Sequence, residues 1–412
     1  MDARDRIRRF LAVSSLAARV YLGYKAITIR QRRFGLPAEE AEARRRAHHD
    51  WSAHQLYDLA VRQQGLLIKF GQILGSRPDL IPDEYVAILS RLQDQVPPRP
   101  FPVIERQITS ELGRPLADVF SRFDREPIAS ASLAQVHRAA LKDGRTVAVK
   151  VQYPGIWEVV RTDLDSIRFL LRILAALERN LDFGPIIEEI SRNVPLELDF
   201  INEGHNAELI ADNFAPRREI IVPRIHWEYT TRRVLVMELL EGIKITDVDA
   251  LQAAGIDLQA VSRLVTGAYC EQLFLHGMFH ADPHPGNLFV RPGPQLVMLD
   301  FGLCRKLDDQ FRLGYAKLVN AMITANAPEM VRAFMESSAP GRAYADPDLM
   351  AEANARMAQA VRANPLVEIP REFLFIMRVT GLLSGLGKHL DSRVDVIGTF
   401  LPYTRAALEE AR

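Results

Sequence analysis

A short segment at residues 280–302 constrains the fold of this chain more than any other feature of its sequence. Leu288–Val290 and Gln295–Leu299 are apolar runs of strand length, and residues 291–294 between them carry two prolines and a glycine, which predicts a turn. Three oxygen-bearing side chains flank this predicted hairpin: Asp282, Asn287 and Asp300. A hairpin of this length brings the three side chains to the same end of the strand pair, where they form a candidate site.

The spacing of these side chains suits phosphoryl transfer. That reaction needs a carboxylate beside the accepting hydroxyl or water, and oxygen ligands for the Mg²⁺ that bridges the phosphates. Asp282 and Asn287 match the Asp-x-x-x-x-Asn of the kinase catalytic loop, and Asp300-Phe301-Gly302 matches the kinase metal-binding loop. Asp-Phe-Gly alone is a weak signal, because such triplets arise by chance in turns. Two motifs in this order across a hairpin are specific, so a purely structural role is the less favoured alternative.

Two histidines in the same segment, His280 and His284, have the spacing of a helical pair of metal ligands. Pro283 and Pro285 exclude a regular helix there, so a zinc site is not predicted. We expect the two rings to stabilise the loop or to stand near the phosphates.

The predicted strand Thr146–Val151 supplies a second signal. Its three valines fall on one face, and Ala148 and Lys150 fall on the other. A small residue leaves room for a flat base, and a lysine two residues on reaches phosphate oxygens, as in the Val-Ala-Ile-Lys strand of kinases. A lysine that merely faces solvent is the alternative. Together with Asp282 and Asp300, the functional interpretation is favoured.

A kinase lysine needs a carboxylate partner on a neighbouring helix. Pro195 suits a first helical turn, and the helix predicted from there to residue 214 places Asp199 and Glu203 on one face. Glu203 follows Lys150 by 53 residues. This distance predicts a helical insertion at about residues 155–195.

Where ordinary kinases carry a Gly-x-Gly-x-x-Gly loop, this chain has small residues with a Cβ: Ala129, Ser130, Ala131 and Ser132. A Cβ limits how closely the backbone approaches phosphate, but we expect the serine hydroxyls and the backbone N–H groups to bind it. After Gly302 the sequence runs directly into a predicted helix at residues 310–324, without an Ala-Pro-Glu motif or a long activation segment. The usual platform for a peptide substrate is missing, which argues against a conventional protein kinase.

The sequence divides into four predicted segments: a basic amphipathic segment (1–36), a helical extension (37–122), a small lobe with a helical insertion (123–242) and a helical lobe (243–412). Between Phe123 and Gln152 the apolar period is two, around an Asp143-Gly144 turn, and a further strand-like pair spans residues 220–225 and 233–238. Strands early and helices late predict an α+β fold, with a small mixed lobe followed by a larger helical lobe.

Composition and charge exclude several classes of protein. Lys and Arg number 52, as do Asp and Glu, so the net charge of zero gives no drive toward nucleic acid. Two cysteines, Cys270 and Cys304, indicate a reducing compartment and no thiolate metal site. No uncharged run exceeds 11 residues, whereas a spanning helix needs about 20. Arg19 and Lys25 interrupt the early apolar run, so a signal peptide is not expected either.

Residues 1–33 depart from this neutrality, with nine basic and two acidic residues. Their apolar side chains recur at helical spacing: Phe10, Val13, Ala17, Val20, Tyr21 and Tyr24. Such a basic amphipathic helix either anchors on anionic lipid or packs on the body of the protein with a solvated basic face. Both interpretations stay open.

A further motif, Lys69-Phe70-Gly71-Gln72, precedes the kinase-like motifs and on its own predicts a buried amphipathic helix with a snorkelling lysine. Taken together, the motifs from about Gly65 to Leu390 resemble the ABC1/ADCK/UbiB family of atypical kinases. The marks of the resemblance are Lys69-Phe70-Gly71-Gln72, the Ala/Ser loop, Lys150, Glu197-Leu198-Asp199, Glu203, the Asp282–Asn287 loop and Asp300-Phe301-Gly302. The loop reads Ala-Ser-Ala-Ser here, where three alanines are more usual.

The resemblance implies a kinase-like two-lobed fold in which the Lys-x-Gly-Gln helices cover the place where a peptide would bind. It implies that Lys69 pairs with Glu197 inside the nucleotide region. It also implies that Lys150 pairs with Glu203.

The same resemblance assigns the nucleotide site, with ATP or ADP and Mg²⁺ as cofactors. Asn287 and Asp300 are expected to bind the metal, and Asp282 to serve as catalytic base. The linker Met237–Gly242 follows the last small-lobe strand, so the backbone of Glu238–Leu240 is expected to hydrogen-bond the adenine.

The family looks like lipid-associated ATPases that support isoprenoid (ubiquinone-like) quinone biosynthesis, with little protein kinase activity. This implies a cytoplasmic kinase or ATPase with peripheral contact on anionic membrane lipid, and quinone-biosynthesis proteins as partners. Two alternatives remain: a nucleotide-gated regulatory protein with negligible phosphoryl transfer, and a small-molecule phosphotransferase.

Overall fold

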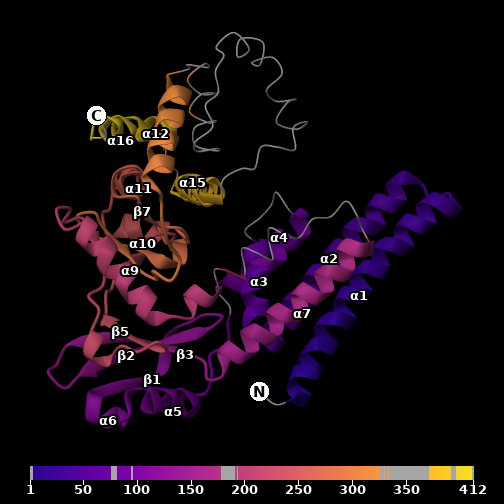
Figure 1. Ribbon diagram of the computed structural model, residues 1–412, viewed down its shortest axis with the longest axis horizontal. Coiled ribbons are helices and arrows are strands. Elements are labelled where there is room, and N and C mark those ends of the chain that lie inside the picture. Colours follow the sequence, from indigo (N-terminus) through magenta and orange to yellow (C-terminus); the bar gives the residue numbers. More distant parts are fainter. Residues whose placement is uncertain are drawn as a thin grey trace. The chain divides into compact units, whose positions relative to one another are not determined.

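The computed structural model describes residues 3–75, 81–93, 96–177, 191–192, 194–324, 329, 333, 371–390 and 396–410. The chain forms two compact units, the first made of Met1–Ile201 with Ile225–Leu239 and the second of Asn202–Arg224 with Leu240–Arg412. Figure 1 labels many of their helices and strands. The finer division into four segments stays a prediction.

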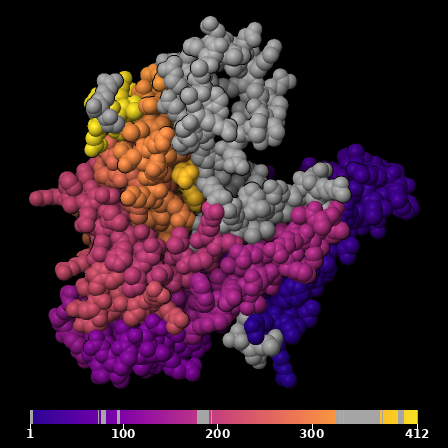
Figure 2. All heavy atoms as spheres, in the orientation of Figure 1, coloured from indigo at the N-terminus to yellow at the C-terminus, as the bar shows by residue number. Residues whose placement is uncertain are grey.

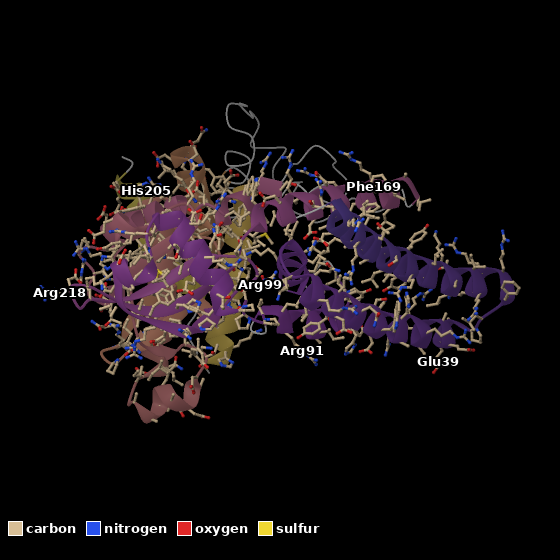
Figure 3. All side chains as sticks on the ribbon, turned by 90° about the horizontal axis from the view of Figure 1, so that it is seen from below. Glu39, Arg91, Arg99, Phe169, His205 and Arg218 are labelled. Carbon is tan, nitrogen blue, oxygen red and sulfur yellow. The ribbon has the colours of Figure 1, made fainter. Side chains whose placement is uncertain are left out.

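The first unit begins with a group of helices: α1 (Ala3–Phe34), α2 (Ala38–Gln63), α3 (Leu66–Gly75), α4 (Asp83–Leu89) and the 3-10 helix η1 (Ser90–Gln93). Helix α7 (Ile156–Leu177), from later in the chain, packs along α1 (Figures 1 and 2). Leu16 and Ile27 of α1 are buried, and Phe10 meets Phe169 of α7 with ring centroids 5.7 Å apart. Figure 3 labels Phe169. The N-terminal helix therefore packs on its own unit through its predicted apolar face.

Arg9 of α1 forms a buried ion pair with Asp163 of α7 and hydrogen bonds with the turn between α2 and α3. The Arg9 guanidinium donates to both carboxylate oxygens of Asp163, at 3.0 and 2.7 Å. It also donates to the carbonyl oxygens of Gln63 and Gln64, at 2.6 and 3.3 Å. Burial raises the pKa of Asp163, and the charge of Arg9 opposes that shift. Because the Asp163 side chain is only 1% exposed, its charge depends on this one cation.

A four-stranded antiparallel sheet follows, in the order β1 (Phe120–Ser130), β2 (Ala134–Leu141), β3 (Thr146–Gln152) and β5 (Val234–Glu238). Helices α5 (Phe101–Leu112) and α6 (Leu116–Val119) lie beside it (Figure 1). The three valines of β3 are fully buried, and α5 packs against this strand. The predicted hairpin at Asp143-Gly144 is confirmed, with Gly144 at a positive φ of 89°. Ala148 and Lys150 occupy the face opposite the valines, as the period-two pattern predicted.

The helix predicted from Pro195 to residue 214 is interrupted. Residues 194–197 are helical, the chain leaves the helix at Leu198 and Asp199, and α9 (Phe200–Asn213) begins anew. The Asp199 carboxylate accepts a hydrogen bond from the Ile201 N–H at 3.1 Å, so this residue caps the second helix. The prediction that Asp199 and Glu203 share one continuous helix is therefore wrong. Most of the second half of the predicted insertion, residues 178–190, lies outside the described residues.

The second unit contains two small sheets. One has the order β4 (Ile220–Ile221), β9 (Gln295–Met298), β8 (Leu288–Arg291) and β6 (Ile243–Lys244), and the other pairs β7 (Met278–His280) with β10 (Cys304–Lys306). The predicted hairpin of β8 and β9 is confirmed. Of the two strand-like segments expected at 220–225 and 233–238, the second is confirmed as β5, and the first contributes only β4, which pairs with β9. The two segments are joined by one antiparallel bridge, between Ile225 and Met237. Strands β6, β7 and β10 were not predicted, since two or three residues show no periodicity.

Helices complete the second unit: α10 (Val248–Ala253), α11 (Leu258–Cys270), the π-helix η3 (Glu271–His276), α12 (Asp309–Ile323), α15 (Arg371–His389) and α16 (Val396–Glu410). The helix predicted at 310–324 is confirmed as α12, which packs against α16. Phe274 of η3 stacks on Tyr315 of α12 with ring centroids 5.6 Å apart. Across the part of the chain that the structure describes, no helix is long and apolar enough to cross a membrane.

Replacing Arg9 with alanine leaves the Asp163 carboxylate buried without its cation. We expect a loss of about 3 kcal/mol in the free energy of unfolding, because an uncompensated buried charge is costly. Urea unfolding followed by circular dichroism measures it. Arg8 is exposed on the same helix, so Arg8→Ala is the matched control and should cost less than about 0.5 kcal/mol. Equal losses in the two variants would contradict the role given to the ion pair.

Candidate functional site

Ala148 and Lys150 lie on the sheet face opposite the buried valines, where Ala148 is buried and Lys150 is partly exposed. Lys150 pairs with Val136 on β2 and with Leu235 on β5, so these side chains share that face. The Lys150 ammonium lies 5.2 Å from the centre of the Phe200 ring, at the start of α9. A small residue and a lysine are thus displayed together, as base and phosphate binding requires.

The Ala/Ser loop closes as a tight turn between β1 and β2. The Ala131 N–H donates to the carbonyl oxygen three residues on at 2.8 Å. Ala129 and Ala131 are exposed, whereas Ser132 is buried. The Ser130 hydroxyl lies 2.9 Å from the phenolic oxygen of Tyr153, so it is already hydrogen-bonded within the protein. Phosphate binding by this loop stays a prediction.

The Lys-x-Gly-Gln motif has a structural reason for each of its residues. The Lys69 ammonium lies 2.8 Å from a carboxylate oxygen of Glu197, which confirms the expected ion pair. Gly71 faces η1, where a Cβ would stand 2.3 Å from a Leu92 methyl carbon. The Gln72 amide donates to the Leu92 carbonyl oxygen at 2.9 Å. Glycine and glutamine thus seat α3 on η1, and the lysine is aimed at Glu197.

In the second unit, one histidine organises the loop that carries Asp282. The fully buried His280 donates from Nε2 to the Asp300 carbonyl oxygen at 2.6 Å, and its Nδ1 accepts from the Asp282 N–H at 3.2 Å. Its own N–H donates to the buried Gln272 amide oxygen at 2.9 Å. His284 accepts from the Gly286 N–H at 3.1 Å. Both histidines therefore stabilise the loop, one of the two roles expected for them.

Asn287 and Asp300 are brought together by the hairpin. Leu299, next to Asp300, donates its N–H to the Asn287 carbonyl oxygen at 2.9 Å. Asp300 has a positive φ of 60°, a conformation that residues other than glycine adopt at a cost. Its carboxylate and the Asn287 amide are partly exposed oxygen donors, the kind that Mg²⁺ prefers, so the residues present fit this cation.

The remaining expected site residues are divided between the two units. Glu203 is 2% exposed in α9. Burial raises the pKa of the Cys304 thiol, and the negative charges of Glu203 and Asp300, in the same unit, raise it further. Lys150 belongs to the other unit, so its pairing with Glu203 stays a prediction. Between Glu238 and Leu240 the chain passes from the first unit to the second, and the adenine contacts of this linker also stay a prediction.

A family model described as the ABC1 atypical kinase-like domain matches residues 91–334, more than half of the chain. The chain belongs to this family. AarF domain-containing protein kinase 1 of Xenopus tropicalis is 37% identical, over 86% of this chain and 74% of that protein. Protein ACTIVITY OF BC1 COMPLEX KINASE 8, chloroplastic, of Arabidopsis thaliana is 34% identical, over 90% of this chain and 55% of that protein.

A solved structure is similar in fold. Rv3197 of Mycobacterium tuberculosis, in its complex with erythromycin, aligns with a TM-score of 0.59 and 23% identity, covering 89% of this chain and 100% of that one. Together with the family match, it confirms the expected α+β, kinase-like two-lobed fold with an N-terminal helical extension. The chain is thus an ABC1-type atypical kinase at the level of family and fold.

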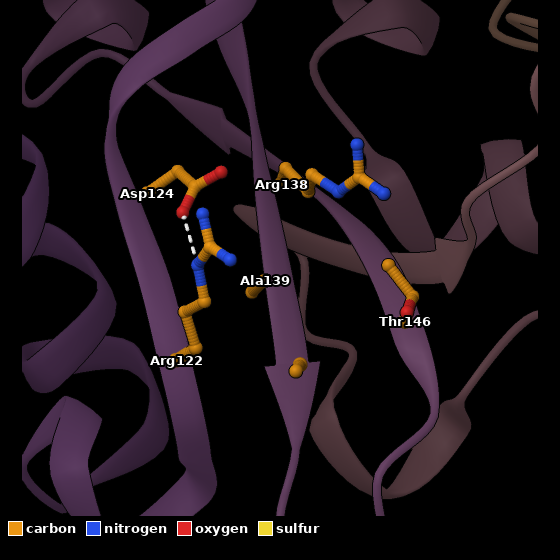
Figure 4. Close-up of a pocket in the computed structure, with 6 residues that line it drawn as sticks. Arg122, Asp124, Arg138, Ala139 and Thr146 are labelled. Carbon is orange, nitrogen blue, oxygen red and sulfur yellow. Dashed lines mark hydrogen bonds and ion pairs between the residues drawn. The ribbon is translucent and has the colours of Figure 1, made fainter.

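A hollow of about 330 Å³ lies on the sheet of this ABC1-family chain, lined by Arg122, Asp124, Arg138, Ala139, Ala140 and Thr146 (Figure 4). Arg138 pairs with Ala148, so the hollow continues the sheet face that carries Lys150. Arg122 donates to Asp124 at 2.9 Å across its rim. None of the site residues expected from the sequence lines it.

Three residues around the Ala/Ser loop were missed by the sequence reasoning. The Gln135 amide accepts from the Arg99 N–H at 2.8 Å and donates to the unprotonated Nε2 of His137 at 2.9 Å. His137 Nδ1 in turn donates to the Asp124 carbonyl oxygen at 2.8 Å, and burial lowers the pKa of this histidine. The third is Tyr153. The sequence signal that could have identified Gln135 and His137 is the presence of polar residues at strand positions that the alternating pattern predicts to be buried.

A double-mutant cycle on Lys69→Met and Glu197→Gln tests the ion pair of the family motif. Both side chains are about 15% exposed, at 16% and 15%, so we expect a coupling of about 1–3 kcal/mol in the free energy of unfolding. Chemical denaturation of the four proteins measures it. The exposed pair Arg44–Glu40, at 41% and 49%, is the matched control and should couple by less than about 0.5 kcal/mol. Strictly additive effects at Lys69 and Glu197 would contradict the pairing.

Proposed function

We propose that the protein binds Mg²⁺ with ATP or ADP and transfers or releases the terminal phosphoryl group, as an atypical kinase or ATPase. The observation that carries this proposal is the bridge made by His280. One buried ring hydrogen-bonds the backbone of both Asp282 and Asp300, while the hairpin sets Asn287 next to Leu299. The three oxygen donors of phosphoryl transfer are therefore held on fixed backbone, and the strained φ of Asp300 is retained.

Each residue then has a role set by its chemistry. Asn287 and Asp300 hold Mg²⁺, which neutralises charge on the phosphates when bound. Asp282 accepts the proton of the attacking hydroxyl or water. Lys150 binds phosphate oxygens, and Lys69 adds a second cation in the nucleotide region. Ala148 leaves room for the base, beside the linker Glu238–Leu240.

The acceptor is proposed from the course of the chain after Gly302. The chain pairs at once as β10 with β7, the Asp308 carboxylate caps α12, and an activation segment has no room between them. A peptide platform is thus replaced by regular structure. We propose water or a lipid-pathway molecule as the acceptor, in support of isoprenoid quinone biosynthesis on the cytoplasmic side of a membrane. Family membership supports this part of the proposal.

The surface of α1 supports the membrane part. Beyond the face that packs on α2 and α7, this helix carries a second apolar stripe of exposed side chains: Ile7, Leu11, Leu22 and Ile29. At about 100° per residue these four fall within roughly 60° of one another around the helix. Exposed arginines flank them, Arg4 and Arg8 at one end and Arg32 and Arg33 at the other, and Asp5 is the acidic residue of the helix. We propose that this stripe rests on anionic lipid.

Asp300→Asn and Asp282→Asn test the chemistry. We expect Asp300→Asn to abolish Mg²⁺-dependent nucleotide binding, and Asp282→Asn to retain binding while losing phosphate release by roughly 100-fold or more. Calorimetric titration and a phosphate-release assay measure the two effects. Asp308→Asn is the control, because asparagine also caps a helix and should leave the rate unchanged.

The same experiment separates the alternatives. Undiminished phosphate release in both variants would contradict the catalytic proposal. Wild-type protein that binds nucleotide tightly but releases no phosphate, with or without lipid, would favour the nucleotide-gated regulatory protein. The hydrogen-bonded hydroxyl of Ser130 is the observation in favour of that second candidate, because it removes a phosphate donor.

The lipid surface is tested with Leu11→Glu and Leu22→Glu combined. Two carboxylates on the stripe should lower binding to vesicles of anionic phospholipid by about tenfold or more, with no change in binding to zwitterionic vesicles. Vesicle co-sedimentation measures it. Met322 of α12 is 50% exposed, so Met322→Glu is the matched control and should bind as the wild type does. Unchanged binding of the double variant would contradict a lipid-facing α1.

A further inference from the structure

Tyr153 contacts the Ala/Ser loop at three points. It follows β3 directly, it is 2% exposed, and its N–H donates to the Leu133 carbonyl oxygen at 3.0 Å. Its phenolic oxygen lies 3.1 Å from the Ala131 carbonyl oxygen and 2.9 Å from the Ser130 hydroxyl. The side chain of Tyr153 thus holds Ser130 and Ala131, and its backbone N–H holds Leu133 at the other end of the turn.

The direction of these hydrogen bonds follows from counting protons. The carbonyl oxygen of Ala131 only accepts, so the single phenolic proton of Tyr153 is donated to it. The Ser130 hydroxyl must then donate its own proton to the phenolic oxygen. Ser130 has no second proton to offer a phosphate. Ser132 is buried, so the donors for phosphate in this loop are its backbone N–H groups other than that of Ala131, which donates to the Ala134 carbonyl oxygen.

The ring of Tyr153 is fixed from its other side. The Arg99 guanidinium carbon lies 5.5 Å from the ring centre, a cation–π contact. Arg99 is itself held at its backbone by Gln135, whose amide accepts from its N–H at 2.8 Å and faces its carbonyl oxygen at 3.4 Å. The proline-rich stretch before α5 thus becomes a support for the turn. Burial raises the pKa of Tyr153, so the phenol stays protonated as this arrangement needs.

We propose that Tyr153 is a positioning residue for the phosphate-binding turn at Ser130–Leu133. By fixing the Ala131 carbonyl group and taking up the Ser130 proton, it orients the backbone N–H groups of the turn for a nucleotide phosphate. This inference rests on the proposed function for its ligand. It adds a residue outside the motifs, and it assigns Ser130 to the support of the turn.

Tyr153→Phe removes one oxygen and keeps the ring. We expect affinity for ATP and for ADP to fall by about fivefold, the effect of one lost hydrogen bond, while affinity for adenosine stays unchanged. Calorimetric titration of the full chain with the three ligands measures it. A residue that merely stabilises the fold would change all three affinities alike, or none.

Two further variants make the test specific. Ser130→Ala removes the hydroxyl that donates to the phenol. In the Tyr153→Phe background it should therefore cause little further loss of ATP affinity, so the effects of the two substitutions should not add. If Ser130 bound phosphate directly, the two losses would add, which would overturn the proposal. Tyr24→Phe is the matched control. It removes a 3.1 Å hydrogen bond between Tyr24 and Tyr85 of the helical extension, and this variant should bind all three ligands with wild-type affinity.

Hydrogen exchange of residues 129–136 without nucleotide gives a second readout. Tyr153→Phe should speed exchange in this segment alone, because the turn loses its support. Unchanged exchange together with unchanged ATP affinity would overturn the proposal. Wild-type protein that binds no nucleotide would contradict the proposed function, and with it the positioning role. If only the positioning role of Tyr153 were wrong, wild type and variant would both bind nucleotide, and with equal affinity.

Discussion

The ion pair between Lys69 and Glu197 joins α3 of the helical extension to the short helical segment at residues 194–197, within the first unit. Two largely buried charges satisfy each other, and separating them would leave both desolvated without a partner. Gly71 and Gln72 seat the opposite side of α3 on η1. Helix α3 is therefore held at two faces, and the position of its lysine is set by packing as well as by charge. A second buried pair, Arg9 with Asp163, fixes the turn that leads into this helix.

The candidate chemistry is supported mainly through the backbone. His280 bonds the main chain at Asp282 and Asp300, and Tyr153 bonds the main chain of the Ala/Ser turn. Fixing main-chain atoms sets where a side chain projects without using the side chain's own oxygen atoms in that contact. It also sustains an unfavourable conformation such as the positive φ of Asp300, because the surrounding bonds over-determine it.

Local pattern was enough to predict the features that depend on neighbours in sequence. The valine alternation of β3, the hairpin of β8 and β9, and the spacing of Asp282 and Asn287 all come from short-range rules. Contacts made across the fold were out of reach. Asp199 has helical neighbours and still caps a new helix, and Tyr153 reads as an ordinary strand-end tyrosine. On α1 apolar side chains occupy two faces of the helix, and only burial shows which of them packs against the protein.

The route of the chain after Gly302 determines where this site can be controlled. In β10, Cys304 pairs with His280, the Leu307 N–H donates to the Gly277 carbonyl oxygen at 2.7 Å, and Asp308 caps α12. Six residues separate Gly302 from the start of α12, and three of them form β10. A segment committed in this way cannot also order and disorder as a switch, which is how activation loops act. We therefore expect any control of the proposed nucleotide site to act through elements of the first unit: α3 with its lysine, and the turn that Tyr153 supports.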